Sequence, residues 1–252
     1  MFIFDLIGRG LADFLTKERD VGAAGAPTPP DMLLASLRPC DVLLVEGKAR
    51  ISSAIKYLTQ STWSHAALYA GPSGDSGAPS LIEADLVGGV RRVGVARYLG
   101  FHTRICRPVG LDEADRRTIV AFAEARLGDS YDLRHVVDLA RYLLPNPPVP
   151  TRWRRRMLAL GSGDPTRAIC STLIAEAFQS IQYPILPDIE LVKAHRDDCE
   201  DCMKEILHIR HHSLFTPRDF DVSPFFEIVK PTLESGFNFK TIQWADVRET
   251  IE

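Results

Sequence analysis

Two side chains far apart in the sequence have the chemistry of an activated cysteine. Cys170 stands at the start of an apolar run with helical character, residues 168–178. A thiol at the N-terminus of a helix lies where the peptide dipoles stabilise its thiolate, and a nearby imidazole stabilises the thiolate further. His65 lies in residues 63–69, which are typical of a strand. Because a Cys–His pair makes a nucleophilic sulfur at neutral pH, the two residues predict acyl chemistry, as in cysteine hydrolases or acyltransferases.

A carboxylate on an apolar strand supplies a third group. Alternation along residues 81–84 turns Glu83 away from its two apolar neighbours on the strand. A buried carboxylate needs a partner, and the imidazole of His65 would serve. The turn-rich residues 71–79 join the two strands, which are therefore expected to be antiparallel neighbours, although the loop does not set their register. Together with Cys170, the three residues offer a nucleophile, a base and an orienting group.

Each of these residues also has a structural interpretation. Free cysteine is among the most buried residue types, so Cys170 could be an inert core thiol. A lone histidine on a strand, such as His65, often has only a structural role. The position of Cys170 at a helix start, with Ser171 and Thr172 after it, favours the catalytic interpretation.

The apolar patterns predict the elements that must position these groups. Apolar runs bounded by glycine or proline indicate strands, and apolar residues at helical spacing indicate helices. Asp112 is a good N-cap for one of these helices, with Asp115 in its acidic first turn. The predicted strands are 41–47, 65–70, 81–84, 103–107 and 225–229, and the predicted helices are 51–58, 113–127 and 132–143.

The chain divides into three parts. Residues 1–20 are predicted to form an amphipathic helix, and residues 21–30 a glycine- and proline-rich linker. Residues 31–252 form the main domain, with a C-terminal extension from about residue 185. The N-terminal helix is expected to dock on the protein's own core. The alternative is a weak contact with a membrane surface, since basic residues in this helix are few.

Bulk composition excludes several classes of protein. A hydrophobic content of 45% with 25% charged residues is ordinary for a globular protein, and no stretch approaches the ~20 apolar residues that span a bilayer. The net charge of -3 argues against a nucleic-acid partner. Five cysteines without the spacing of a disulfide framework favour reduced thiols and a cytoplasmic protein. The oligomeric state is left open.

A set of motifs in a fixed order resembles a known family. Taken together, they resemble the circularly permuted NlpC-type papain-like cysteine hydrolases, above all the YiiX/YebB-like group, over about residues 38–230. The resemblance implies an α+β fold in which an antiparallel sheet packs against helices, with His65 and Glu83 on adjacent strands and Cys170 at the start of a packed helix. The motifs are residues 39–45, 59–69, 81–84, 128–132, 169–174 and 216–226.

The resemblance also implies roles for single residues. Cys170 is the nucleophile, His65 the base and Glu83 its orienting partner. Cys40 departs from the pattern, because the family usually has glycine before the aspartate; a change in local packing is expected. Many relatives look like exported lipoproteins, and the missing export signal argues against a cell-wall substrate. Roles in substrate binding are expected for three further residues, Tyr131, Trp63 and Ser64.

The implied reaction is acyl transfer through a thioester, with no cofactor. The expected substrate is a small molecule, a peptide or an acyl-lipid with an amide or ester bond. One alternative is an acyltransferase that passes the acyl group to an amine or lipid, because fold alone does not separate the two reactions. Another is a binding module without catalysis, which the intact Cys170, His65 and Glu83 set disfavours.

Two further clusters have competing interpretations. Zinc could bind a C-x2-C pair flanked by histidines, but the spacing fits no common zinc template, so no metal site is predicted. The residues concerned are His195, Cys199, Cys202 and His208. The basic residues in 152–156 are expected to form a solvated helix face, and the alternative is a patch for an anionic substrate or lipid headgroup.

Overall fold

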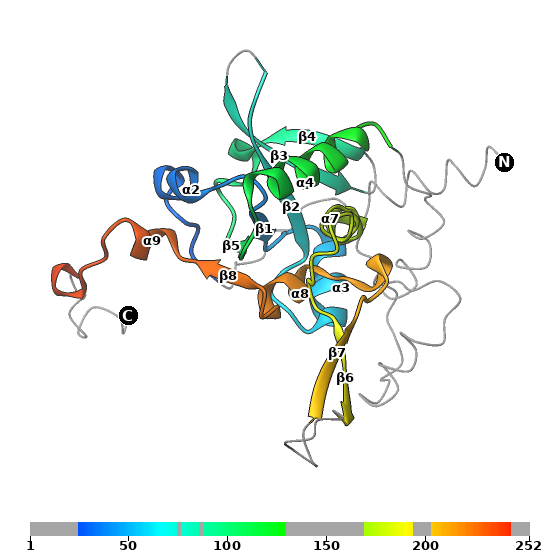
Figure 1. Ribbon diagram of the computed structural model, residues 1–252. Coiled ribbons are helices and arrows are strands. Elements are labelled where there is room, and N and C mark those ends of the chain that lie inside the picture. Colours follow the sequence, from blue (N-terminus) through cyan, green and yellow to red (C-terminus); the bar gives the residue numbers. More distant parts are fainter. Residues whose placement is uncertain (1–24, 75–76, 86–87, 130–168, 194–202, 243–252) are drawn as a thin grey trace, which may run out of the picture.

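The centre of the molecule is a six-stranded sheet whose neighbouring strands are all antiparallel (Figure 1). The computed structural model describes residues 25–74, 77–85, 88–129, 169–193 and 203–242. The strands follow the order β4 (Gly89–Gly94), β3 (Ala78–Asp85), β2 (His65–Ser73), β1 (Val42–Val45), β5 (Thr103–Pro108) and β8 (Phe226–Val229). The predicted antiparallel pairing of the strands that carry His65 and Glu83 is confirmed.

Helices surround this sheet, and a separate two-stranded ribbon extends away from it (Figure 1). The ribbon pairs β6 (Asp188–Lys193) with β7 (Met203–His208). The α-helices are α2 (Pro30–Ser36), α3 (Arg50–Thr59), α4 (Glu113–Ala125), α7 (Ile169–Gln179), α8 (Pro217–Val222) and α9 (Pro231–Glu234). The short 3-10 helices are η1 (Val95–Tyr98), η2 (His212–Leu214) and η3 (Phe239–Thr241).

The start of α4 confirms the predicted cap. The Asp112 carboxylate accepts a hydrogen bond from the Asp115 N–H at 2.8 Å, and the Asp115 carboxylate accepts one from the Asp112 N–H at 3.2 Å. This reciprocal pair satisfies two backbone donors that a helix start otherwise leaves free, and it puts negative charge at the positive end of the helix dipole.

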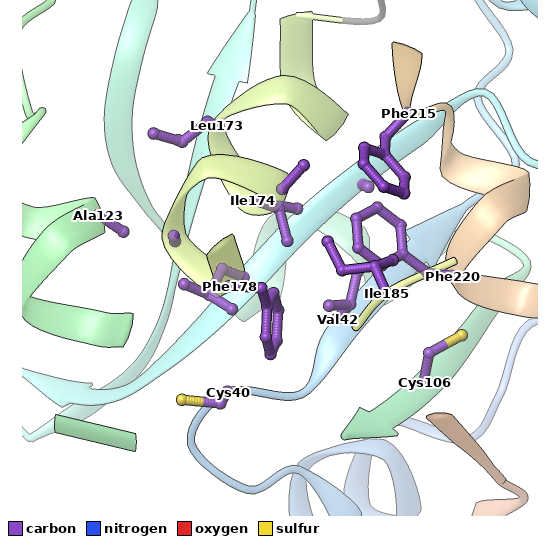
Figure 2. Packing of buried hydrophobic residues seen from close by; sticks show 14 of the residues in the cluster. Cys40, Val42, Cys106, Ala123, Leu173, Ile174, Phe178, Ile185, Phe215 and Phe220 are labelled. Atoms are coloured by element: carbon purple, nitrogen blue, oxygen red, sulfur yellow. The ribbon is translucent and has the colours of Figure 1, made fainter. Parts of the chain in front are cut away.

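Alternation along the central strands builds two apolar clusters, one on each face of the sheet. One cluster joins Leu44 and Leu68 to α7 and α4, and Figure 2 shows Phe215, Phe220 and Ile185 gathered beside Ile174 of α7. The other cluster packs the next residues along the same strands against α2 and η1. β1 is buried along its whole length because both of its faces are covered.

Cys40, just before β1, has a backbone φ of 73°. That left-handed conformation favours glycine, which explains why glycine would suit this position. The cysteine is fully buried and its Sγ lies 3.3 Å from the carbonyl oxygen of Arg116, at the start of α4. At this position, therefore, a buried thiol just before β1 contacts the backbone of α4.

Several predicted segments lie outside the described residues. They include the N-terminal helix at 1–20, the helix at 132–143 and the basic residues in 152–156. Within the described ranges, no helix is both long and apolar enough to cross a bilayer. α2 begins at Pro30, the last residue of the predicted linker, because proline suits the first turn of a helix.

We expect the packing of α7 on the sheet to dominate the stability of the fold. Phe178 is fully buried, with the rings of Tyr183 and Phe226 each 5.3 Å from its own. Phe178→Ala should lower the free energy of unfolding by about 3–5 kcal/mol, measured by urea denaturation. Arg117→Ala, at an exposed position of α4, is the control and should change it by less than about 0.5 kcal/mol. A loss below about 1 kcal/mol for Phe178→Ala would contradict this account.

Candidate active site

The structure brings Cys170, His65 and Glu83 together. His65 is the first residue of β2, and its Nε2 lies 3.0 Å from Oε2 of Glu83 on β3. The thiol of Cys170, in the first turn of α7, lies close enough to the His65 side chain for each group to shift the pKa of the other. Because Glu83 occupies Nε2, Nδ1 is the ring nitrogen left to face the sulfur. The arrangement is that of a nucleophile, a base and an orienting carboxylate.

The groups come from opposite sides of the sheet and meet at the end of β2. Glu83 lies on the face of η1, since its neighbours Ile82 and Ala84 both join the cluster on the other face. α7 packs on that other face through buried residues that follow Cys170. His65 is the only one of the three at a strand end, so its ring can contact groups from both faces.

α7 is anchored by charge as well as by apolar packing. The Glu176 carboxylate lies 3.2 Å from Nη1 of Arg126 at the end of α4 and 3.2 Å from Nε2 of His212 in η2. These contacts are partly exposed, so each contributes modestly to stability. They nevertheless tie α7 to α4 and η2, which helps to hold Cys170 against His65.

The electrostatics favour a thiolate beside an imidazolium. Burial raises the pKa of Cys170, but the charge and hydrogen bond of His65, together with the Ala66 N–H and the Ser171 hydroxyl, outweigh burial and bring this pKa below its usual value. Burial lowers the pKa of His65, but the Cys170 thiolate and Glu83 raise it to about 10. Since each charge stabilises the other, the pair favours the thiolate and the imidazolium more strongly than either group would alone.

Two other described cysteines behave in the opposite way. Cys40 and Cys106 are fully buried. Burial, the largest influence on both, raises the pKa of Cys40 to about 12 and raises that of Cys106 as well. Both thiols therefore stay protonated and unreactive. Among the cysteines that the structure describes, Cys170 alone has the electrostatics of a nucleophile.

Glu83 accepts hydrogen bonds from two residues that the sequence analysis did not identify. Its carboxylate is 1% exposed; Oε2 accepts a hydrogen bond from the Tyr98 hydroxyl, and Oε1 accepts two from Arg91, at 3.1 and 2.9 Å. Burial raises the pKa of Glu83, but hydrogen bonds from His65, Tyr98 and Arg91 lower it to about 2. Arg91 lies directly opposite Glu83 in the β3–β4 register, so a hairpin prediction for β4 could have found it. Tyr98 lies in η1 and carries no comparable pattern.

The two predicted substrate-binding residues that the structure describes are both buried. Trp63 is 2% exposed, and its Nε1 donates to the Asp221 carboxylate at 2.9 Å. Ser64 is 3% exposed, and its Oγ accepts a hydrogen bond from the Gly47 N–H at 2.9 Å. Both hold the segment in front of His65 in place, and substrate contact by them stays a prediction. Tyr131 lies outside the described residues.

The structure describes only one of the four residues considered as zinc ligands. His208 is exposed on β7, with its Nε2 2.9 Å from Glu190 on β6. His195, Cys199 and Cys202 lie outside the described residues. Within the ranges that the structure describes, no group of three or more histidine, cysteine or acidic side chains could hold a metal ion.

Comparison with known proteins gives a family match over the region that contains His65 and Glu83. Residues 36–142 match the model of a family described as permuted papain-like amidase enzymes, YaeF/YiiX. No curated protein matches the chain. Among solved structures, the chain is similar to the crystal structure of metalloprotein yiiX from Escherichia coli O157:H7, with 15% identity and a TM-score of 0.46, over 77% of this chain and 96% of that one. This match confirms the resemblance for the region that carries His65 and Glu83, whereas Cys170 lies outside the matched residues.

Proposed function

We propose that this chain is a cysteine hydrolase that cleaves an amide bond through the thiolate of Cys170. The proposal is carried by the proximity of Cys170 to His65, whose ring is held by Glu83, since the pKa of the thiol is lowered and that of the imidazole is raised. The amidase description of the family supports an amide rather than an ester. Peptides and acyl-lipids with an amide bond are the proposed substrate classes.

The reaction would proceed in two halves. The Cys170 thiolate attacks the carbonyl carbon, and the His65 imidazolium gives its proton to the leaving amine as the C–N bond breaks. The resulting thioester is hydrolysed by water, which loses a proton to the now neutral His65, and the carboxylic acid leaves as the thiolate reforms. A backbone N–H at the start of α7, such as that of Cys170 itself, would stabilise the oxyanion. Glu83 would keep the ring oriented throughout.

Loss of the sulfur should abolish turnover. Cys170→Ala is expected to lower kcat by about a thousandfold or more, because no other described group can form the acyl-enzyme. The assay would use N-acyl aminocoumarins and p-nitrophenyl acyl esters. Cys106→Ala removes a buried thiol away from the site and is the matched control; its rate per folded molecule should be unchanged.

Product analysis separates hydrolysis from transfer. Incubation with and without an added amine, followed by mass spectrometry, should yield free acid in both cases. A new amide in the presence of the amine would identify an acyltransferase and contradict the proposed hydrolase. No turnover of any amide or ester, with an unreactive Cys170, would favour a binding module.

The pH dependence follows from the two shifted groups. The thiolate forms above the lowered pKa of Cys170, and the imidazolium persists below about pH 10. Alkylation of Cys170 by iodoacetamide should therefore continue well below ~8.5, the value for free cysteine. In His65→Ala, the midpoint of the labelling curve should rise to ~8.5 or above, because burial is no longer opposed.

The turnover profile should be bell-shaped for kcat/KM, with its alkaline limb near the pKa of His65. Labelling of the wild-type Cys170 with the midpoint of an ordinary thiol would contradict the proposal. So would a midpoint that His65→Ala leaves in place.

A further inference from the structure

Both oxygens of the Glu83 carboxylate accept hydrogen bonds from neighbouring side chains. Oε2 contacts Nε2 of His65 and also accepts the hydrogen bond from the Tyr98 hydroxyl. Oε1 accepts two hydrogen bonds from one guanidinium, at 3.1 Å from Nε and 2.9 Å from Nη2 of Arg91. Four donor atoms from three side chains therefore occupy the roughly four lone-pair sites of this buried carboxylate.

The number of donors has a geometric consequence. The terminal torsion of a glutamate is broad, so a carboxylate with one partner can rotate about it. Here the guanidinium fork of Arg91 holds one oxygen and the Tyr98 hydroxyl holds the other, so both the position and the plane of the group are set. The ring of Tyr98 also lies beside that of His65, with centroids 5.8 Å apart and planes at 37°.

These two residues are themselves restrained. Arg91 forms a second ion pair with Asp85, the last residue of β3. Tyr98 is 7% exposed and packs edge-on against Phe101. Neither side chain is therefore a mobile surface group that contacts Glu83 only transiently.

We propose that Tyr98 and Arg91 are positioning residues, which lock the Glu83 carboxylate in the orientation that holds the His65 ring against Cys170. The inference rests on the proposed function, since it assigns a role to groups that act through the proposed base. A competing account gives the opposite effect: donors on a carboxylate withdraw charge from it, and so would weaken its hold on the imidazolium.

The charged and titratable groups around this centre are the same in both accounts. Cys170 faces His65 from α7, and Arg97 of η1 approaches Oε1 of Glu83 with its Nε at 4.0 Å. Asp85 pairs with Arg91. A variant that removes one hydroxyl and leaves all of these charges in place therefore isolates the positioning effect.

Tyr98→Phe is that variant, because it keeps the ring and removes only the donor to Glu83. The readout is the pH dependence of Cys170 alkylation by iodoacetamide, which needs no substrate. We expect the labelling midpoint to rise by about half to one pH unit, so that labelling below it slows by about three- to tenfold. Tyr69→Phe is the matched control, since Tyr69 lies in the same apolar cluster on β2, and its midpoint should equal that of the wild type.

Arg91→Lys gives an independent test. It keeps the positive charge but loses the two-donor fork, so we expect a rise of the midpoint in the same direction. Thermal unfolding of each variant shows whether a shift arises in folded protein, and KM for an amide substrate should stay constant while kcat falls.

The outcomes are distinct from those of the proposed function. A wild-type midpoint of an ordinary thiol contradicts catalysis by Cys170 itself. A low wild-type midpoint that stays the same in both folded variants, or that falls in Tyr98→Phe, overturns only the positioning role; a fall would support the charge-withdrawal account.

Discussion

The imidazole of His65 lies between two anionic groups, the Cys170 thiolate and the Glu83 carboxylate, and the candidate chemistry depends on this arrangement. Burial opposes all three charges, since it raises the pKa of the thiol and of the carboxyl and lowers that of the imidazole. The Cys170 thiolate raises the pKa of His65 more than Glu83 does, and His65 in turn lowers the pKa of both acidic groups. The site is therefore a single electrostatic unit.

The sheet provides the rigidity that such a unit needs. Hydrogen-bonded registers fix β1, β2 and β3 relative to one another, and both faces are covered by apolar clusters. Close-packed interiors deform little, so the end of β2 has a defined position. α7 packs on one face and carries the thiol, while η1 packs on the other and carries Tyr98. The site lies where these two layers both reach the same strand end.

The described thiols show that partners, more than burial, set reactivity. Cys40, Cys106 and Cys170 are all at most 5% exposed. Two of them have raised pKa values because nothing nearby stabilises the thiolate enough to offset desolvation. The third has a lowered pKa because an imidazole, a backbone N–H and a hydroxyl all face the sulfur. Exposure alone would not have distinguished the candidate nucleophile from the two inert thiols.

Local patterns in the sequence predicted β1, β2, β3, β5 and β8, the capped helix α4 and the three candidate site residues, because periodicity and residue chemistry are local properties; β4, β6 and β7 were not predicted. The face on which Glu83 lies followed from alternation along one strand. The register of the sheet and the donors to the carboxylate came only from the tertiary structure. Tyr98 reaches Glu83 because η1 packs on the same face of the sheet, and the buried indole N–H of Trp63 is satisfied by Asp221 of α8, which is distant in sequence. Such contacts depend on which distant segments pack together. A periodic pattern indicates which face of a strand or helix is buried, but it does not indicate which segment packs against that face.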